Sequence, residues 1–215
     1  MFRRLKQNIK EKTGRATTTK YSPEQEQGLK YVEDSKKCVE EIQKAIEHMG
    51  QRWKSGGLTA TEEIGDPANV LSGKLPKGKY GHALRALQEN QTELGRLERR
   101  AHEELLKTTD GVYKAWLKTE SQNARKIVSE LKTRRVDKDA FTSAYNQKQT
   151  ADRQAQMDQA NEKFEQQITV FEAECANFPT YQQAHARALK TMAEALSKHF
   201  DECSQAAKKG AEKAK

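Results

Sequence analysis

The sequence predicts an all-α protein whose three long helices pack as an elongated antiparallel coiled-coil bundle. Apolar side chains recur every three or four residues along most of the 215-residue chain, which is helical spacing. Only four prolines interrupt it. Charged residues make up 33% of the chain and hydrophobic residues 34%, which is too little apolar surface for a thick core. A narrow helical bundle fits this composition.

The N-terminal segment, residues 1–20, is basic and amphipathic, with seven Lys or Arg against one Glu. On a helix, one face carries Phe2, Leu5 and Ile9. The cations around them include Arg3, Arg4, Lys6 and Lys10. This pattern suits an anionic membrane surface, with the apolar side chains inserted among the lipids. A solvated, disordered tail is the alternative that the pattern leaves open.

The first helix is predicted over residues 22–55. Ser22 is a good N-cap, Pro23 suits the first helical position, and Gln25 completes a capping box. The apolar seam that follows is Leu29, Val32, Val39, Ile42, Ile46, Met49 and Trp53. Glycines and two prolines are concentrated after it, so residues 56–79 are predicted to form a long loop or a broken helix end.

The second helix is predicted to run without interruption over residues 80–140, with an apolar stripe from Leu84 to Leu131. At about 1.5 Å per residue, sixty residues would extend roughly 90 Å. Asp110-Gly111 is the weakest point of this prediction, because Asp-Gly often marks a turn. Late in the helix, Lys132, Arg134, Arg135 and Lys138 surround one Asp137, and Arg125 and Lys126 precede them. Charge runs on helices are usually solvated faces, so the interest of this one lies in its position.

The third helix is predicted over residues 142–205, with Pro179 kinking but not ending it. Its heptad seam is Phe164, Ile168, Phe171, Cys175, Phe178, Gln182, His185, Leu189, Met192, Leu196, His199 and Cys203. Residues 155–174 carry five acidic residues against one lysine, and residues 206–215 form a lysine-rich tail.

Several classes of function are excluded by what the sequence lacks. No catalytic, phosphate-binding or dinucleotide-binding motif occurs, so a non-enzyme without a cofactor is expected. Cys38, Cys175 and Cys203 are isolated, which argues against a metal site or a disulfide and favours half-buried thiols. No apolar run could span a bilayer and no secretory signal begins the chain, so a cytoplasmic protein is expected. Nucleic acid is not an expected partner, because the aromatic residues lie in the seams.

Three motifs carry a resemblance to a known family. Tyr80-Gly81-His82-Ala83-Leu84 is similar to the start of the second helix of endophilins, and Arg134-Arg135-Val136-Asp137-Lys138-Asp139 lies at a matching distance from it. Residues 163–172 are similar to the third helix of the same proteins. The chain therefore resembles the BAR domain of the endophilin and amphiphysin type, called N-BAR. It departs from endophilins after Asp139, where a dense run of Lys and Arg is missing.

The resemblance implies that residues 21–205 form a BAR domain, a crescent-shaped homodimer that binds anionic phospholipid membranes. It would act as a peripheral protein in endocytosis and membrane remodelling, sensing or generating curvature. Phe2, Leu5 and Ile9 would insert into the membrane. The expected headgroup-binding residues are Arg3, Arg4, Lys6, Lys10, Arg125, Lys126, Lys132, Arg134, Arg135, Lys138 and Lys148.

The alternative is a coiled-coil structural adaptor or tether that binds other helical proteins, since heptads alone fit it equally well. Segregated charge separates the two interpretations. Positive charge gathers late in the second helix while residues 155–174 are acidic, which favours one membrane-facing surface and an opposite acidic one.

Overall fold

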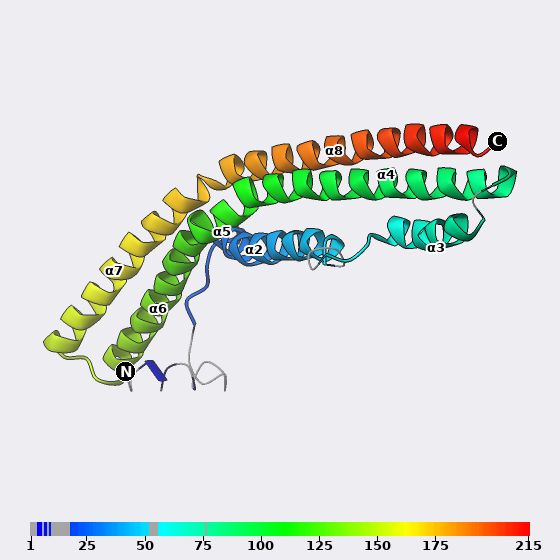
Figure 1. Cartoon of the computed structure of the whole chain (residues 1–215). Coiled ribbons are helices and arrows are strands. Elements are labelled where there is room, and N and C mark those ends of the chain that lie inside the picture. The colour runs from blue at the N-terminus through cyan, green and yellow to red at the C-terminus, as the bar shows by residue number, and fades with distance from the viewer. Residues whose placement is uncertain (1–3, 6, 8, 10–17, 52–55, 76) are drawn as a thin grey trace. The chain divides into compact units, whose positions relative to one another are not determined.

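The protein is all-α over the residues that the computed structural model describes, which are 4, 5, 7, 9, 18–51, 56–75 and 77–215. This confirms the predicted fold class. The helices are α2 (Pro23–Met49), α3 (Ala60–Lys74), α4 (Lys79–Thr108), α5 (Ala115–Lys118), α6 (Glu120–Gln147), α7 (Ala151–Cys175) and α8 (Phe178–Lys213), with a π-helical segment at Thr109–Lys114 between α4 and α5 (Figure 1). The chain divides into two compact units, residues 1–38 with 116–182, and residues 39–115 with 183–215.

The first unit is built around α6 and α7, which run side by side and are joined by a short turn (Figure 1). Its buried core is Val32, Ala124, Val128, Leu131, Phe164, Phe171 and Phe178. Most of these positions belong to the predicted seams. Tyr31 stacks near Phe178, with ring centroids 4.4 Å apart, so the start of α2 is tied to the start of α8 by aromatic packing.

The capping box predicted at the start of α2 is confirmed. The backbone N–H of Gln25 donates to Ser22 Oγ at 3.2 Å, and the backbone N–H of Ser22 donates to Gln25 Oε1 at 3.0 Å. Two N–H groups that the first helical turn leaves without partners are thereby satisfied.

The boundaries of the later helices differ from the expected ones. α6 continues to Gln147, because residues 139–147 hold no glycine or proline to stop it. α7 then begins at Ala151, where Thr150 caps the helix by accepting a hydrogen bond from the N–H of Arg153 at 3.4 Å. The prediction that Pro179 only kinks a continuous helix is wrong. α7 ends at Cys175, and Pro179 lies in the first turn of α8, where a residue without an N–H is tolerated.

In the second unit, the segment expected to be a loop contains the helix α3. Its start is a capping box, in which Thr59 Oγ1 accepts from the N–H of Glu62 at 3.2 Å and Glu62 Oε2 accepts from the N–H of Thr59 at 2.9 Å. Glu62 also forms a two-pronged ion pair with Arg99 of α4, with both distances 2.5 Å. A Cβ at Gly95 would clash with Glu62, so this glycine allows the close approach of α3 to α4.

The uninterrupted second helix was also a wrong prediction. Regular α-helical hydrogen bonding ends at Thr108, and the π-helical segment holds Asp110-Gly111, the expected weak point. The hydroxyl of Thr109 donates from Oγ1 to the carbonyl of Leu105 at 2.8 Å. This carbonyl would otherwise accept only from the backbone N–H groups of the helix, so the side chain competes with regular helical hydrogen bonding. A turn at Thr119 then separates α5 from α6.

A buried histidine holds the end of α2 within the second unit. His102 of α4 is 3% exposed, and its Nε2 lies 2.9 Å from the carbonyl oxygen of Ile46, in the last turn of α2. Carbonyls in the last turn of a helix have no partner within the helix, so this side chain supplies one. A Cβ at Gly50 would clash with the His102 ring, so the position requires glycine. Met49, expected in the core, is 48% exposed.

The contact between Gly50 and His102 predicts that Gly50→Ala lowers the free energy of unfolding by about 1–3 kcal/mol, as overpacked cores do. Gly73→Ala is the matched control, because a Cβ at Gly73 meets nothing within 4 Å. In a helix that exchange is worth up to about 1 kcal/mol in favour of alanine. Denaturant unfolding measures the stability of both variants. A Gly50→Ala protein as stable as wild type would contradict the contact.

The ion pair between Glu62 and Arg99 predicts a pH-dependent stability of α3. Hydrogen bonding from Arg99 lowers the pKa of Glu62, so the pair stabilises the folded form above the ordinary carboxyl pKa of about 4.3. The stabilisation is lost as the pH falls through the lower folded pKa. Glu62→Gln should therefore speed hydrogen exchange in residues 60–74 several-fold at neutral pH. The difference from wild type should disappear in acid, and Asp66→Asn, at an exposed position of α3, should have no such effect.

Candidate functional site

Exposed cations lie along one stretch of α6 in the first unit. Arg125 and Lys132 are seven residues apart and share a face, and Lys126 lies beside them around the helix. Lys148 follows in the turn after α6. Within the part of the chain that the structure describes, none of these four has an ion-pair partner. We name Arg125, Lys126, Lys132 and Lys148 the outward cations.

Three other expected binding residues on α6 are engaged by carboxylates. Arg134 pairs with Glu130 at 2.5 Å, and Arg135 lies 3.7 Å from Asp139 with a side chain only 16% exposed. Lys138 pairs with Glu165 of α7 at 3.2 Å, and its Nζ lies 4.5 Å from the centre of the Phe164 ring. Their charge is therefore partly neutralised within the protein. The prediction treated all the cations of α6 alike, whereas the structure divides them into paired cations and outward cations.

The N-terminal segment contacts α6 through an ion pair. Arg4 donates two hydrogen bonds to the carboxylate of Asp137, from Nε at 2.6 Å and from an Nη at 2.7 Å. These bonds raise the pKa of Arg4, so its guanidinium stays charged. Leu5 and Ile9 are more than half exposed. The other expected residues of this segment, Phe2, Arg3, Lys6 and Lys10, lie outside the described residues.

A second contact joins the end of the same segment to α6. Asp139 is 7% exposed and accepts hydrogen bonds from Thr19, from its backbone N–H at 3.1 and 3.2 Å and from its Oγ1 at 2.5 Å. A buried carboxylate is tolerated only when it is paired and hydrogen-bonded. Thr19 and Arg135 meet that requirement.

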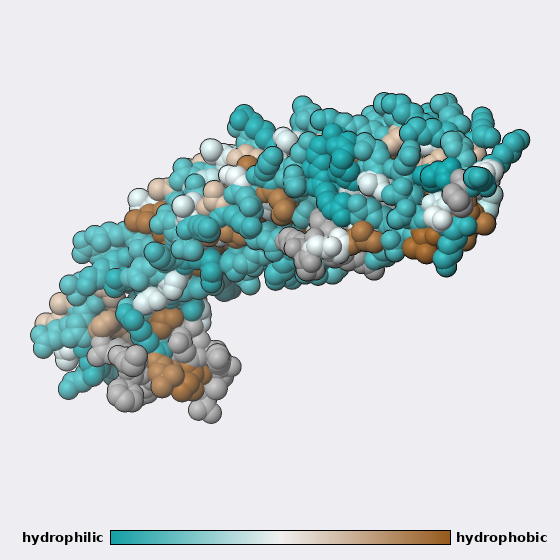
Figure 2. Space-filling model, in the orientation of Figure 1, coloured by the Kyte–Doolittle hydropathy of each residue, from teal (hydrophilic) through white to brown (hydrophobic). Residues whose placement is uncertain are grey.

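An open hollow on the first unit is formed by Arg4, Tyr21 and residues of α6. It is lined by Arg4, Tyr21, Ser129, Lys132, Thr133, Arg135 and Val136. Three of these residues are cations and three carry hydroxyl groups, a chemistry that favours anions. Figure 2 shows a mostly hydrophilic surface, with hydrophobic atoms next to the grey residues at its lower left.

The contacts of Asp137 and Asp139 were missed in the sequence, where both residues counted as part of a family motif and Asp137 as a negative charge within a basic run. The pairs Glu130–Arg134 and Arg135–Asp139 have the i, i+4 spacing of helical ion pairs, and that signal could have separated Arg134 and Arg135 from the outward cations. The contacts with Arg4 and Thr19 have no such local signal.

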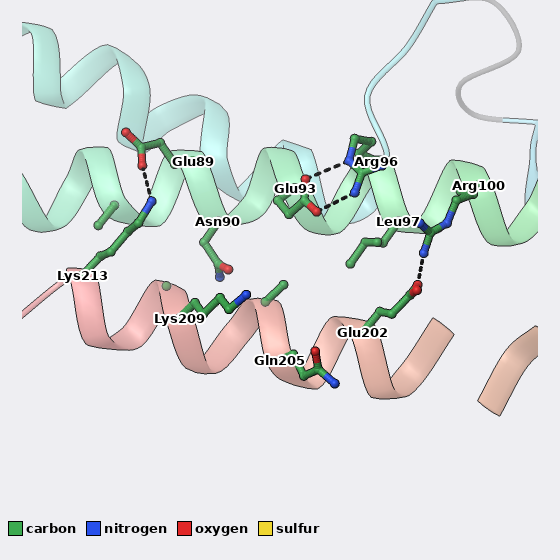
Figure 3. A pocket seen from close by; sticks show the side chains of 13 residues that line it. Glu89, Asn90, Glu93, Arg96, Leu97, Arg100, Glu202, Gln205, Lys209 and Lys213 are labelled. Carbon is green, nitrogen blue, oxygen red and sulfur yellow. Dashed lines mark hydrogen bonds and ion pairs between the residues drawn. The ribbon is translucent and has the colours of Figure 1, made fainter. Parts of the chain in front are cut away.

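A second hollow, on α4 and α8 of the second unit, is lined by charges that are mostly paired with one another (Figure 3). Glu89 pairs with Lys213 at 3.1 Å, Glu93 with Arg96 at 2.7 Å, and Arg100 with Glu202. The Glu89–Lys213 and Arg100–Glu202 pairs join the two helices, whereas Glu93–Arg96 lies within α4, and together the three pairs leave little free charge for a ligand. The outward cations are therefore the better candidate site.

Other kinds of site find little support in the described part of the chain. No group of three or more His, Cys, Asp or Glu there could hold a metal ion. No helix there is both long and apolar enough to cross a membrane. Cys175 and Cys203 are partly buried, as expected, and burial raises the pKa of both thiols, whereas Cys38 is exposed.

Comparison with known proteins identifies a family. No curated protein matches the sequence. A model of the BAR domain family matches residues 1–213, which is nearly the whole chain. Proteins of this family are helical modules that bind and curve membranes and that dimerise. With its all-α fold and its exposed cations on α6, the chain belongs to the BAR domain family.

Proposed function

We propose that this protein binds anionic phospholipid membranes as a homodimer and senses or generates their curvature, as a peripheral protein of the cytoplasmic membrane surface. The observation that carries the proposal is the set of outward cations on and after α6, which have no ion-pair partner among the described residues. Each cation near an anionic surface contributes about 1 kcal/mol of attraction.

The paired cations of α6 contribute less to binding in this proposal. Arg134, Arg135 and Lys138 already interact with carboxylates, so lipid headgroups would have to compete with Glu130, Asp139 and Glu165 for them. Arg135 is the least available, because its side chain is 16% exposed. The attraction therefore comes mainly from the outward cations.

An N-BAR mode of action is the finer proposal for the N-terminal segment. Leu5 and Ile9 are 58% and 55% exposed, and they neighbour Arg4. Apolar side chains flanked by cations suit the boundary between lipid headgroups and acyl chains. Shallow insertion there, with Phe2 as a further apolar residue, would expand one leaflet and favour curvature.

Dimerisation is supported by the apolar surface of the second unit. Ile64 and Val70 on α3, and Leu189 and Phe200 on α8, are between 48% and 65% exposed. Covering such side chains stabilises an assembly by about 25 cal/mol per Å². A second copy of the chain would cover them, and two copies of the α6 surface would act on one membrane with a higher effective concentration.

Reversing the charge of the outward cations should abolish binding to anionic membranes. For the triple variant Arg125→Glu, Lys126→Glu and Lys132→Glu, we expect co-sedimentation with phosphatidylserine vesicles to fall more than tenfold at low salt, because attraction becomes repulsion. Wild-type binding should weaken as salt increases.

The matched control reverses three exposed cations elsewhere, on one face of α8: Arg187, Lys190 and Lys198. It changes the net charge equally, and we expect it to keep most of the binding. Equal loss in both variants would mean that net charge alone drives binding. Wild-type protein that does not bind anionic vesicles would favour the helical adaptor instead.

Replacing Leu5 and Ile9 by serine should uncouple membrane binding from membrane shaping. The cations remain, so we expect co-sedimentation to fall less than threefold, whereas tubulation seen by electron microscopy should be lost with the insertion. Val170→Ser on α7 is the control, because Val170 is also an exposed apolar residue of the first unit, at 47%. Full tubulation by the Leu5, Ile9 variant would contradict the insertion mechanism.

A further inference from the structure

Among the described residues 4, 5, 7 and 9, Arg4 contacts α6 through Asp137. Arg4, Leu5, Gln7 and Ile9 are helical, and on a helix positions 4 and 7 lie on a different side from positions 5 and 9. Gln7 is 3% exposed and Arg4 is bound to Asp137, whereas Leu5 and Ile9 are mostly exposed. The apolar side therefore faces away from the protein.

This orientation is the reverse of what folding alone would produce. An amphipathic helix that docks on its own protein normally buries its apolar stripe and exposes its polar face. Here the polar side supplies the contact and the apolar side stays exposed, so the docking does not serve to bury Leu5 and Ile9. The docking instead determines the direction in which Leu5 and Ile9 point.

Two carboxylates of α6 bind the described residues Arg4 and Thr19. Asp137 binds Arg4, and Asp139, two residues further on, binds Thr19 through both its N–H and its hydroxyl group. The two contacts differ in burial. The side chain of Asp139 is 6% exposed and that of Asp137 is 18% exposed. Asp139 is thus a buried anchor, and Asp137 holds Arg4 nearer the surface.

The surface on which Leu5 and Ile9 are presented also carries positive charge. Arg4 and Lys132 line the same hollow, and Ser129 and Thr133 of α6 line it too. A segment that carries both exposed apolar side chains and Arg4 matches an anionic lipid surface, in which headgroups lie above acyl chains.

We infer that Asp137 is a positioning residue, which holds Arg4 so that Leu5 and Ile9 are already presented outward, toward an anionic lipid surface, before the protein meets lipid. The inference rests on the proposed membrane function. Ordering a segment in advance lowers the entropy lost on binding, so the held segment inserts more readily than a free one.

Electrostatics alone predicts the opposite effect of removing this carboxylate. Asp137→Asn deletes a negative charge and frees Arg4 for lipid phosphate, so a purely electrostatic segment would bind and insert better. A positioned segment would insert less well, because Leu5 and Ile9 are no longer held outward. The sign of the change in insertion therefore decides between the two.

The experiment compares wild type, Asp137→Asn and a control, Glu165→Gln. The control removes the same charge from the first unit and frees Lys138, but Glu165 has no contact with the described residues of the N-terminal segment. Hydrogen exchange of residues 4–9 is measured without vesicles. Tubulation of vesicles made of equal parts phosphatidylcholine and phosphatidylserine is then scored at equal amounts of bound protein.

We expect Asp137→Asn to exchange several-fold faster in residues 4–9 and to form several-fold fewer tubules per bound protein, with Glu165→Gln close to wild type on both measures. Unchanged exchange, or tubulation by Asp137→Asn equal to or above that of wild type, would overturn the inference. If wild type itself bound vesicles without tubulating them, the proposed insertion would fail, whereas the exchange measurement would still test the contact between Arg4 and Asp137.

Discussion

The buried carboxylate of Asp139 is the contact on which the arrangement of the candidate surface depends. It accepts hydrogen bonds from Thr19, three residues before the N-cap of α2, and it lies one turn from Arg135 on α6. One charged group thus fixes the chain that enters α2 and withdraws Arg135 from the surface. Because a buried carboxylate without these partners would be strongly unfavourable, the start of α2 and the charge pattern of α6 are set together.

Helical spacing decides which cations of α6 remain available. Arg134 and Arg135 each have a carboxylate four residues away, in Glu130 and Asp139, and they pair with them along the helix. Lys132 is exposed and has no such pair among the described residues. The same helix therefore carries cations that stabilise the fold and cations that are open to a ligand. A surface that attracts anions needs the second kind, because a neutralised cation adds little long-range attraction.

The sequence predicted what depends on local periodicity and failed where packing overrode a local signal. The seam positions Leu131, Phe164 and Phe171 are buried, because regular spacing determines which side of a helix faces its neighbour. Glycine in residues 56–79 indicated a loop, but the capping box at Thr59 starts a helix, and Gly95 on α4 lets it approach closely. In the candidate site, the charge pattern of the sequence was enough to predict Lys132 as an exposed cation. The contact of Arg4 with Asp137 joins residues 133 apart in sequence, and no local rule reports it.

Exposed apolar residues occur in both units, and the charges around them favour different binding partners. Leu5 and Ile9 neighbour Arg4, so an anionic lipid surface attracts that region. Ile64 on α3 is equally exposed, but Glu63 and Asp66 flank it, and anionic headgroups would repel these carboxylates. A protein surface with lysine or arginine at its rim suits Ile64 better, and a second copy of a chain with a net charge of +8 has such residues available. Under the proposed function, charge thus favours lipid as the cover for Leu5 and Ile9 and a protein partner as the cover for Ile64.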